Sequence, residues 1–189
     1  MNIAEYIKQV GASQGCHDIL LLTTEPMKII GKEYSIQKDS HFEFCAYVYA
    51  YILFYLHIQL KDDDPISEEV HFYSVQYLKL ILEKNVYKLE LQVRIPNKEN
   101  FVVDKLTAYS KEIIEYKQDP NYKPKFLFSS FLMYPTFDIE LIYEKSKLID
   151  DSVAEKFNKC IEEFINYLVN ICEYFSLYFN DAKAKAQIK

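Results

Sequence analysis

Glu68 and His71, a carboxylate and an imidazole three residues apart, are the closest approach in this sequence to a metal-binding motif. Di-iron helical bundles use one Glu-x-x-His pair from each of two helices, with a further glutamate from each of two others. The chain has no second Glu-x-x-His pair. His71 also falls on the apolar side of its predicted helix, which favours a packed core histidine. We therefore expect no metal and no cofactor, and a site at Glu68 and His71 stays a weak alternative.

Nucleophilic chemistry has one candidate, Cys16, which is followed directly by His17. A thiol is activated when a base lies within hydrogen-bond distance, but adjacent residues in a chain usually point apart. The chain also lacks the sequence motifs of serine hydrolases, zinc peptidases and dinucleotide-binding enzymes. The sequence therefore predicts no catalytic residues, and a protein that is not an enzyme.

Tyrosines recur at a spacing of four residues in the first third of the chain. On a helix this spacing puts them on one face. There they serve either as a partner surface or as the boundary of the core, with their hydroxyl groups in water. Both interpretations stay open. The candidate surface for a ligand or partner contains Tyr47, Tyr51, Tyr55, His57, His71 and Phe72.

These tyrosines lie in the most apolar stretch of the chain, the 13 residues from Phe44 to Leu56, which contain no Asp, Glu, Lys, Arg or His. As a helix this stretch is about 20 Å long, against about 30 Å of hydrocarbon in a bilayer, so we expect it not to cross a membrane. Ser40 and Glu43 have the spacing of a capping box, which predicts the start of the helix. The sequence thus predicts a central apolar helix over residues 41–60, covered on several sides.

Helical periodicity and capping signals predict four further helices. Gly11 follows the first, Asp64 and Pro65 open the second, and Ser152 with Glu155 opens the last. These helices are expected over residues 3–10, 65–84 and 104–117 and over a long C-terminal segment from residue 152.

Apolar and β-branched runs between these helices predict strands. The clearest run alternates apolar and charged residues over 88–95, and Gly31 with Lys32 favours an earlier hairpin turn. The expected strand segments are 19–24, 27–30, 33–36, 88–95, 125–134 and 137–143. We therefore predict the α+β fold class, with an antiparallel sheet of about five strands packed against amphipathic helices. A single α+β domain would span residues 1–180, followed by a polar, frayed tail over residues 181–189.

The amino-acid composition argues against some classes of function. The 189 residues carry 28 acidic and 22 basic side chains, for a net charge of −6, and Arg94 is the one arginine. Nucleic-acid surfaces are basic and rich in arginine, so we expect no nucleic-acid partner. The four cysteines form no C-x-x-C pair and the first residues do not form a secretory signal, so we expect reduced thiols and a cytoplasmic protein.

These observations predict a non-enzymatic cytoplasmic protein-binding domain. It would be an adaptor, a small chaperone, or an immunity or antitoxin-like inhibitor that blocks a basic partner. Homo-oligomerisation is a further expectation, because Phe72 falls on the polar side of its helix and strand edges would be open. The alternative is a small-molecule-binding or enzymatic domain with a pocket lined by tyrosine and histidine. A membrane is not expected among the partners.

Overall fold

The computed structural model describes residues 2–33, 41–60, 64–88, 98–119, 121–133 and 138–166. All regular secondary structure in these ranges is helical, so the predicted α+β fold and its antiparallel sheet are wrong. A further helix runs over residues 151–166, where the C-terminal helix was predicted. The other helices are α1 (Ile3–Val10), α2 (Ala12–Glu33), α3 (His41–Gln59), α4 (Pro65–Lys88), α5 (Lys98–Gln118), α6 (Phe126–Leu132) and α7 (Ile139–Ser146).

The strands expected over residues 19–24 and 27–30, and the hairpin turn after them, are replaced by the single long helix α2. Its buried residues include Cys16, Ile19, Thr23 and Met27, which are spaced by three or four. That is the period of a helix with one buried face. Leucine, which is abundant here, is also a strong helix former, and short apolar runs do not separate strand from helix.

The strands expected over residues 125–134 and 137–143 are short helices, α6 and α7. The residues of α6 from Phe126 to Phe131 are all buried, so no polar face marks its period. Asp138 is the N-cap of α7, and its side chain accepts a hydrogen bond from the backbone N–H of Leu141 at 3.0 Å. In the strand prediction Asp138 was only one of the polar members of an alternating pattern. The strand expected over residues 88–95 lies outside the described residues apart from Lys88, which ends α4.

The predicted helices are confirmed within the described residues, with some bounds extended, and the predicted C-terminal helix beyond residue 166 lies outside them. Helix α1 covers residues 3–10 and ends at Gly11, whose φ of 89° suits glycine. The N-cap of α4 is Asp64, whose Oδ1 accepts from the N–H of Ile66 at 3.1 Å. The capping box predicted for the last helix is replaced by Asp150, whose Oδ1 accepts from the backbone N–H of Ser152 at 2.9 Å. The domain boundaries stay predictions, and the tail over residues 181–189 lies outside the described residues.

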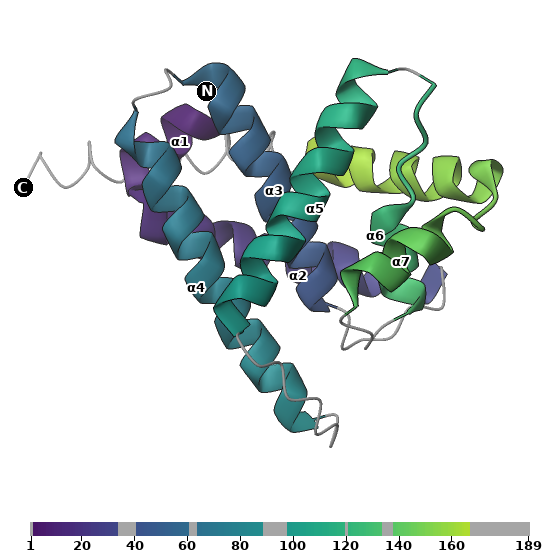
Figure 1. Cartoon of the computed structure of the whole chain (residues 1–189). Coiled ribbons are helices and arrows are strands. Elements are labelled where there is room, and N and C mark those ends of the chain that lie inside the picture. Colours follow the sequence, from purple (N-terminus) through teal and green to yellow (C-terminus); the bar gives the residue numbers. More distant parts are fainter. Residues whose placement is uncertain are drawn as a thin grey trace, which may run out of the picture.

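Helix α3 is the centre of the fold, as predicted. Figure 1 shows it between α4 on one side and α5 on the other, with α1 and α2 nearby. Every residue from Phe42 to Ile52 is buried, so α3 has no polar face toward solvent over three turns. Among the described residues, no helix is long and apolar enough to span a membrane.

Helices α3 and α5 form the most extensive contact in the described part of the chain. Phe42 stacks on Phe101 with ring centroids 5.8 Å apart, and Tyr47 meets Tyr109 edge to face at 5.6 Å. Because the residue numbers rise together along both helices, α3 and α5 run in the same general direction. This register places Glu43 of α3 opposite the middle of α5.

Candidate functional site

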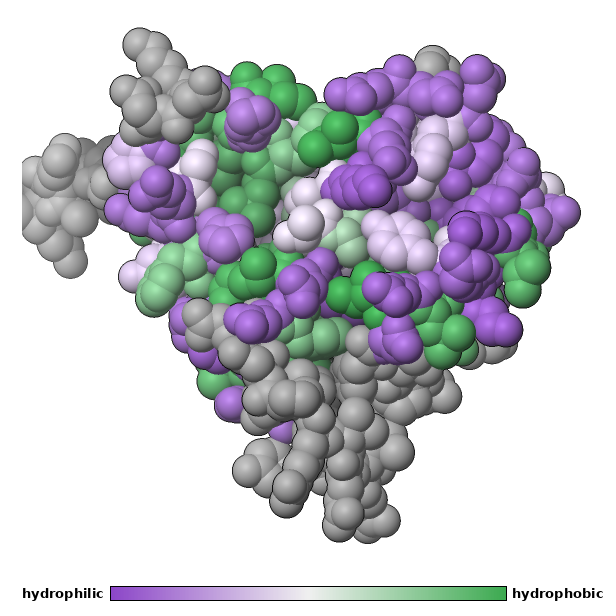
Figure 2. Space-filling view, viewed as in Figure 1, coloured by the Kyte–Doolittle hydropathy of each residue, from purple (hydrophilic) through white to green (hydrophobic). Residues whose placement is uncertain are grey.

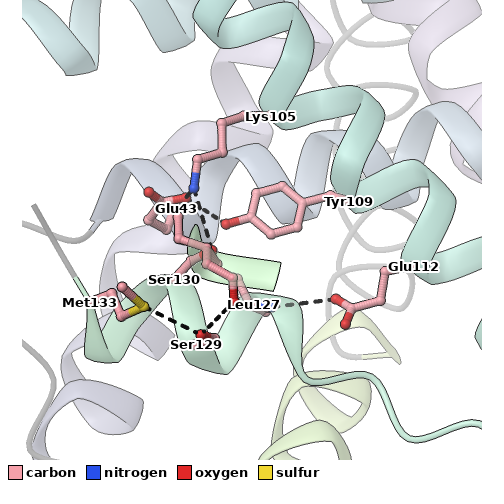
Figure 3. A network of polar contacts seen from close by, with 9 residues as sticks. Glu43, Lys105, Tyr109, Glu112, Leu127, Ser129, Ser130 and Met133 are labelled. Atoms are coloured by element: carbon pink, nitrogen blue, oxygen red, sulfur yellow. Dashed lines mark hydrogen bonds and ion pairs between the residues drawn. The ribbon is translucent and has the colours of Figure 1, made fainter. Parts of the chain in front are cut away.

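A buried polar network joins α3, α5 and α6 in the core (Figure 3). The ammonium of Lys105 donates a hydrogen bond to Oε2 of Glu43 at 3.0 Å and lies 3.4 Å from Oγ of Ser130. The hydroxyl of Tyr109 donates to the same carboxylate oxygen at 2.5 Å. The side chains of Glu43 and Lys105 both have no exposed surface. This network therefore ties three helices together away from solvent.

Aromatic rings surround the ammonium of Lys105. It lies 5.9 Å from the ring centroid of Phe101, 5.7 Å from that of Tyr109 and 5.3 Å from that of Phe126. These distances are within the range of cation–π attraction. Burial lowers the pKa of Lys105, and the carboxylate of Glu43 opposes that shift. Burial together with Glu43 raises the pKa of the Tyr109 hydroxyl, which therefore acts as a donor.

The second carboxylate oxygen of Glu43, Oε1, is buried and accepts no hydrogen bond from any described residue. The capping box predicted from Ser40 and Glu43 gave this side chain a different role, at the start of α3. Ser40 lies outside the described residues, but Oε2 of Glu43 is committed to α5. The capping box therefore stays a prediction, and the structure adds a role that the sequence did not predict for Glu43, that of a buried ion-pair partner.

A second buried carboxylate, Glu112 on α5, holds the start of α6. Its Oε1 accepts hydrogen bonds from the backbone N–H groups of Lys125 and Phe126, both at 2.6 Å. Its Oε2 lies 3.4 Å from the N–H of Leu127. Burial raises the pKa of Glu112 to about 7, and the three backbone donors oppose that rise. Its role is to satisfy donors that a helix start leaves without intrahelical partners.

Thr23, His41 and Cys45 form a third polar cluster, between α2 and α3. The Thr23 hydroxyl donates to the carbonyl of Leu20 at 2.7 Å. Its oxygen lies 3.0 Å from Nε2 of His41 and 3.3 Å from Sγ of Cys45, and the latter two atoms are 3.3 Å apart. Since the only hydroxyl proton goes to Leu20, this network assigns the imidazole proton to Nε2.

That assignment bears on nucleophilic chemistry. An Nε2 that carries a proton cannot take one from the Cys45 thiol. Burial raises the pKa of Cys45 to about 12 and lowers that of His41. Cys16 behaves similarly, because burial raises its pKa to about 12. The geometry at rest therefore activates neither thiol.

The predicted tyrosine surface is mostly interior. Tyr47 and Tyr51 are buried and Tyr55 is half-buried. Tyr47 packs on Tyr109, and the rings of Tyr51 and Tyr55 are 5.2 Å apart. Of these three tyrosines, Tyr47 and Tyr51 are therefore core residues, and only Tyr55 lies at the boundary of the core.

The predicted histidines lie on the surface. His57, at the end of α3, and His71, on α4, are both exposed, so the expectation of a packed core His71 is wrong. The structure does not bring them into an enclosed site with the tyrosines. Glu68 is also exposed, and no group of three metal-ligating side chains occurs among the described residues.

Phe72 is exposed as predicted, with 56% of its surface open to solvent. Its ring contacts Tyr73 at 5.3 Å between centroids. Glu68 and Glu69, four and three residues earlier, are its neighbours on the same helix face and are also exposed. Neither glutamate forms an ion pair with another described residue. We call Glu68, Glu69 and Phe72 the α4 surface.

The opposite side of α4 fixes the orientation of this surface. Val70, Ser74, Leu78 and Leu82 are fully buried, and the carbonyl of Val70 lies 3.7 Å from the Cys16 thiol of α2. Because α4 packs on α2 and α3 along this face, the α4 surface points outward. It combines one large apolar side chain with two negative charges.

Comparison with protein-family models, with curated proteins and with solved structures finds no match to this chain. The candidate site therefore rests on the geometry of these residues alone.

Sequence reasoning missed Lys105 and Glu112, although both left a signal. On α5 the buried residues Val102, Leu106, Tyr109 and Ile113 form the apolar stripe. Lys105 and Glu112 fall within that stripe at helical spacing. A charged residue inside an apolar stripe needs a buried partner. Glu43, the one acid in the apolar helix α3, was the available partner for Lys105.

Proposed function

We propose that this protein is a non-enzymatic protein-binding domain whose α4 surface takes a basic segment of another polypeptide. The observation that carries the proposal is the exposed aromatic ring of Phe72 beside Glu68 and Glu69. An aromatic anchor gives contact area at low entropic cost, and flanking charges select the partner's sign. We further propose that it works in the cytoplasm, in keeping with the free thiols of Cys16, Cys45 and Cys160.

The charge of the whole chain supports a cationic partner. A net charge of −6 attracts basic ligands over several ångströms, and the attraction weakens as salt screens it. By contrast, the pocket lined by tyrosine and histidine has less support. Tyr47 and Tyr51 are packed inside the core, while His57 on α3 and His71 on α4 are exposed.

The chain contains no tryptophan, which permits a direct binding test. The probe is a short cationic amphipathic peptide of lysine, leucine and one tryptophan, excited at a wavelength that tyrosine does not absorb. Burial of the indole on the protein shifts its emission to the blue. We expect saturable binding that weakens with added salt, and no binding of the same peptide with glutamate in place of each lysine.

Two variants localise the binding. Phe72→Ala removes the anchor and is expected to weaken binding about tenfold or more, as loss of an interface hot spot does. Leu148→Ala is the matched control, because Leu148 is an apolar side chain that is 77% exposed away from α4. Equal effects of the two substitutions, or equal binding of the acidic peptide, would rule out the α4 surface.

A second copy of this chain is the competing partner for the α4 surface. Sedimentation of the same samples without peptide measures that outcome. A dimer that dissociates on Phe72→Ala would replace the basic partner by self-association, whereas a monomer that binds the cationic peptide supports the proposal.

A further inference from the structure

The ammonium group of Lys117, near the end of α5, lies close to two aromatic rings and one carboxylate. It lies 5.4 Å from the ring centroid of Tyr51 and 5.3 Å from that of Tyr116. It also lies 3.8 Å from Oε1 of Glu162. These groups come from α3, from α5 and from the helix over residues 151–166. Two aromatic rings and a carboxylate thus surround one cation.

The separation of Lys117 from Glu162 is longer than a hydrogen bond. The carboxylate therefore acts on this cation through its charge, and the rings act through their π faces. Both interactions attract a cation that carries no N–H donor, as in the aromatic cages that bind methylated lysine and choline. The local chemistry suits an alkylated ammonium as well as it suits Lys117.

The rings and the carboxylate have contacts that do not depend on Lys117. The ring of Tyr51 packs against those of Tyr47 and Tyr55, with centroids 6.0 and 5.2 Å apart. Burial and the nearby carboxylate of Glu162 raise the pKa of the Tyr116 hydroxyl. Lys117 is different, because its flexible side chain is 36% exposed and that of Glu162 is 37% exposed. Exposed ion pairs contribute little net stability, since long side chains lose freedom when they form them. Displacement of Lys117 therefore costs little, and it leaves the position beside the rings of Tyr51 and Tyr116 to another cation.

We propose that Tyr51, Tyr116 and Glu162 form a binding site for the alkylated ammonium group of an external ligand, and that Lys117 occupies it as an intramolecular competitor. The ligand is a quaternary ammonium compound or a trimethylated lysine in a polypeptide, which share this chemistry. The site is separate from the α4 surface, and its test does not involve Phe72.

The test compares the wild-type chain with Lys117→Gln, which removes the competitor. Tetramethylammonium chloride and a peptide with one trimethyllysine are the probes, and the shifts of the tyrosine ring signals in NMR spectra report binding. We expect Lys117→Gln to bind tetramethylammonium about two- to fivefold more tightly than the wild type, the range expected for an exposed cation–π contact. Adding Glu162→Gln to that variant is expected to reverse the gain.

Lys147→Gln is the matched control for charge. Lys147 forms an exposed ion pair with Glu144 at 2.7 Å, and its substitution removes the same positive charge elsewhere. Lys117→Arg, which retains a tethered cation, is expected to show no gain. A gain of equal size in Lys147→Gln, or unchanged affinity in Lys117→Gln with a wild-type circular dichroism spectrum, would overturn the proposal.

The two probes separate the sources of the ligand. Binding of tetramethylammonium and of the trimethyllysine peptide with similar affinity supports a site for small quaternary ammonium compounds. Stronger binding of the trimethyllysine peptide than of tetramethylammonium, and of its unmodified counterpart, supports recognition of a modified polypeptide. Equal binding of the methylated and unmodified peptides would contradict the preference for alkylated cations.

Discussion

The ammonium of Lys105 lies 3.0 Å from Oε2 of Glu43, and neither side chain reaches solvent. Removing two charges from water is unfavourable, and their mutual attraction offsets that only when both partners are present. Such pairs contribute more to the choice of one helix arrangement than to net stability in several systems. Here the pair links the central helix α3 to α5 at one register. Replacing one partner is therefore expected to change the stability of the fold measurably.

Lys105→Met is expected to lower the free energy of unfolding by about 3–5 kcal/mol, because it leaves the carboxylate of Glu43 buried without a counter-ion. Urea unfolding followed by circular dichroism measures this. Glu43→Met combined with Lys105→Met removes both charges and is expected to be less destabilising than Lys105→Met alone. The control is Lys147→Met, which breaks the exposed pair with Glu144 and should change stability by less than about 1 kcal/mol.

Equal losses from Lys105→Met and Lys147→Met would show that the buried pair is not coupled to the fold. A double variant less stable than the single variant would show that the ion pair contributes net stability beyond what an apolar pair provides.

The raised pKa of Glu112 predicts that the free energy of unfolding depends on pH near neutrality. Burial raises its pKa from the ordinary 4.5 to about 7 in the folded chain, so the folded state holds a proton that the unfolded state has released. The free energy of unfolding is therefore expected to fall as pH rises from 4.5 to 7, and to level off above 7. Urea unfolding at several pH values measures the slope.

The comparison with Glu112→Gln isolates this group. His41 acts in the opposite sense, because burial lowers its pKa and its contribution to stability is lost at acidic pH. Glu115, Tyr122 and Tyr143 also lie near Glu112 and are unchanged in the variant. The wild-type curve minus the variant curve should decline between pH 4.5 and 7. A flat difference would mean that Glu112 does not change its protonation in that window.

The thiols offer a test of the catalytic alternative. Cys16 and Cys45 are buried with pKa values raised to about 12, whereas Cys160 is partly exposed. Iodoacetamide reacts with thiolates, so Cys160 is expected to be labelled first among these three in the native protein. Peptide mass spectrometry after timed labelling measures the order, with the unfolded protein in urea as the reference. Rapid labelling of Cys45 would instead indicate that His41 activates it.

The sequence predicted the positions of helices more reliably than their number. Helix α3 followed from its apolar composition, and α1 and α4 followed from Gly11 and Asp64, because each local signal coincides with the packing. The strand prediction for residues 19–24 was wrong because a run of isoleucine, leucine and threonine is compatible with a strand and with a helix. The helix is favoured there by the packing of α2 on α4, a helix that lies far from α2 in the sequence.

The exposure of some candidate site residues could be predicted from local patterns, whereas that of others depended on contacts between distant helices. Exposure of Phe72 followed from its position opposite the apolar face of α4. The burial of Tyr47 and Tyr51 depended on α5, whose register against α3 is set by contacts such as that between Lys105 and Glu43. The grouping of Lys117 with Glu162 joins residues of two helices whose mutual position no local pattern describes.

The most direct test of the proposed protein-binding role is a reversal of charge on the α4 surface. In the variant Glu68→Lys with Glu69→Lys, the cationic tryptophan peptide should lose its binding and the acidic peptide should gain it, with Phe72 intact. Glu140→Lys with Glu144→Lys on α7 makes the same change of net charge at exposed positions elsewhere, and should leave the wild-type preference in place. Unchanged binding of the cationic peptide to the α4 variant, or the same reversal in the α7 variant, would contradict the account.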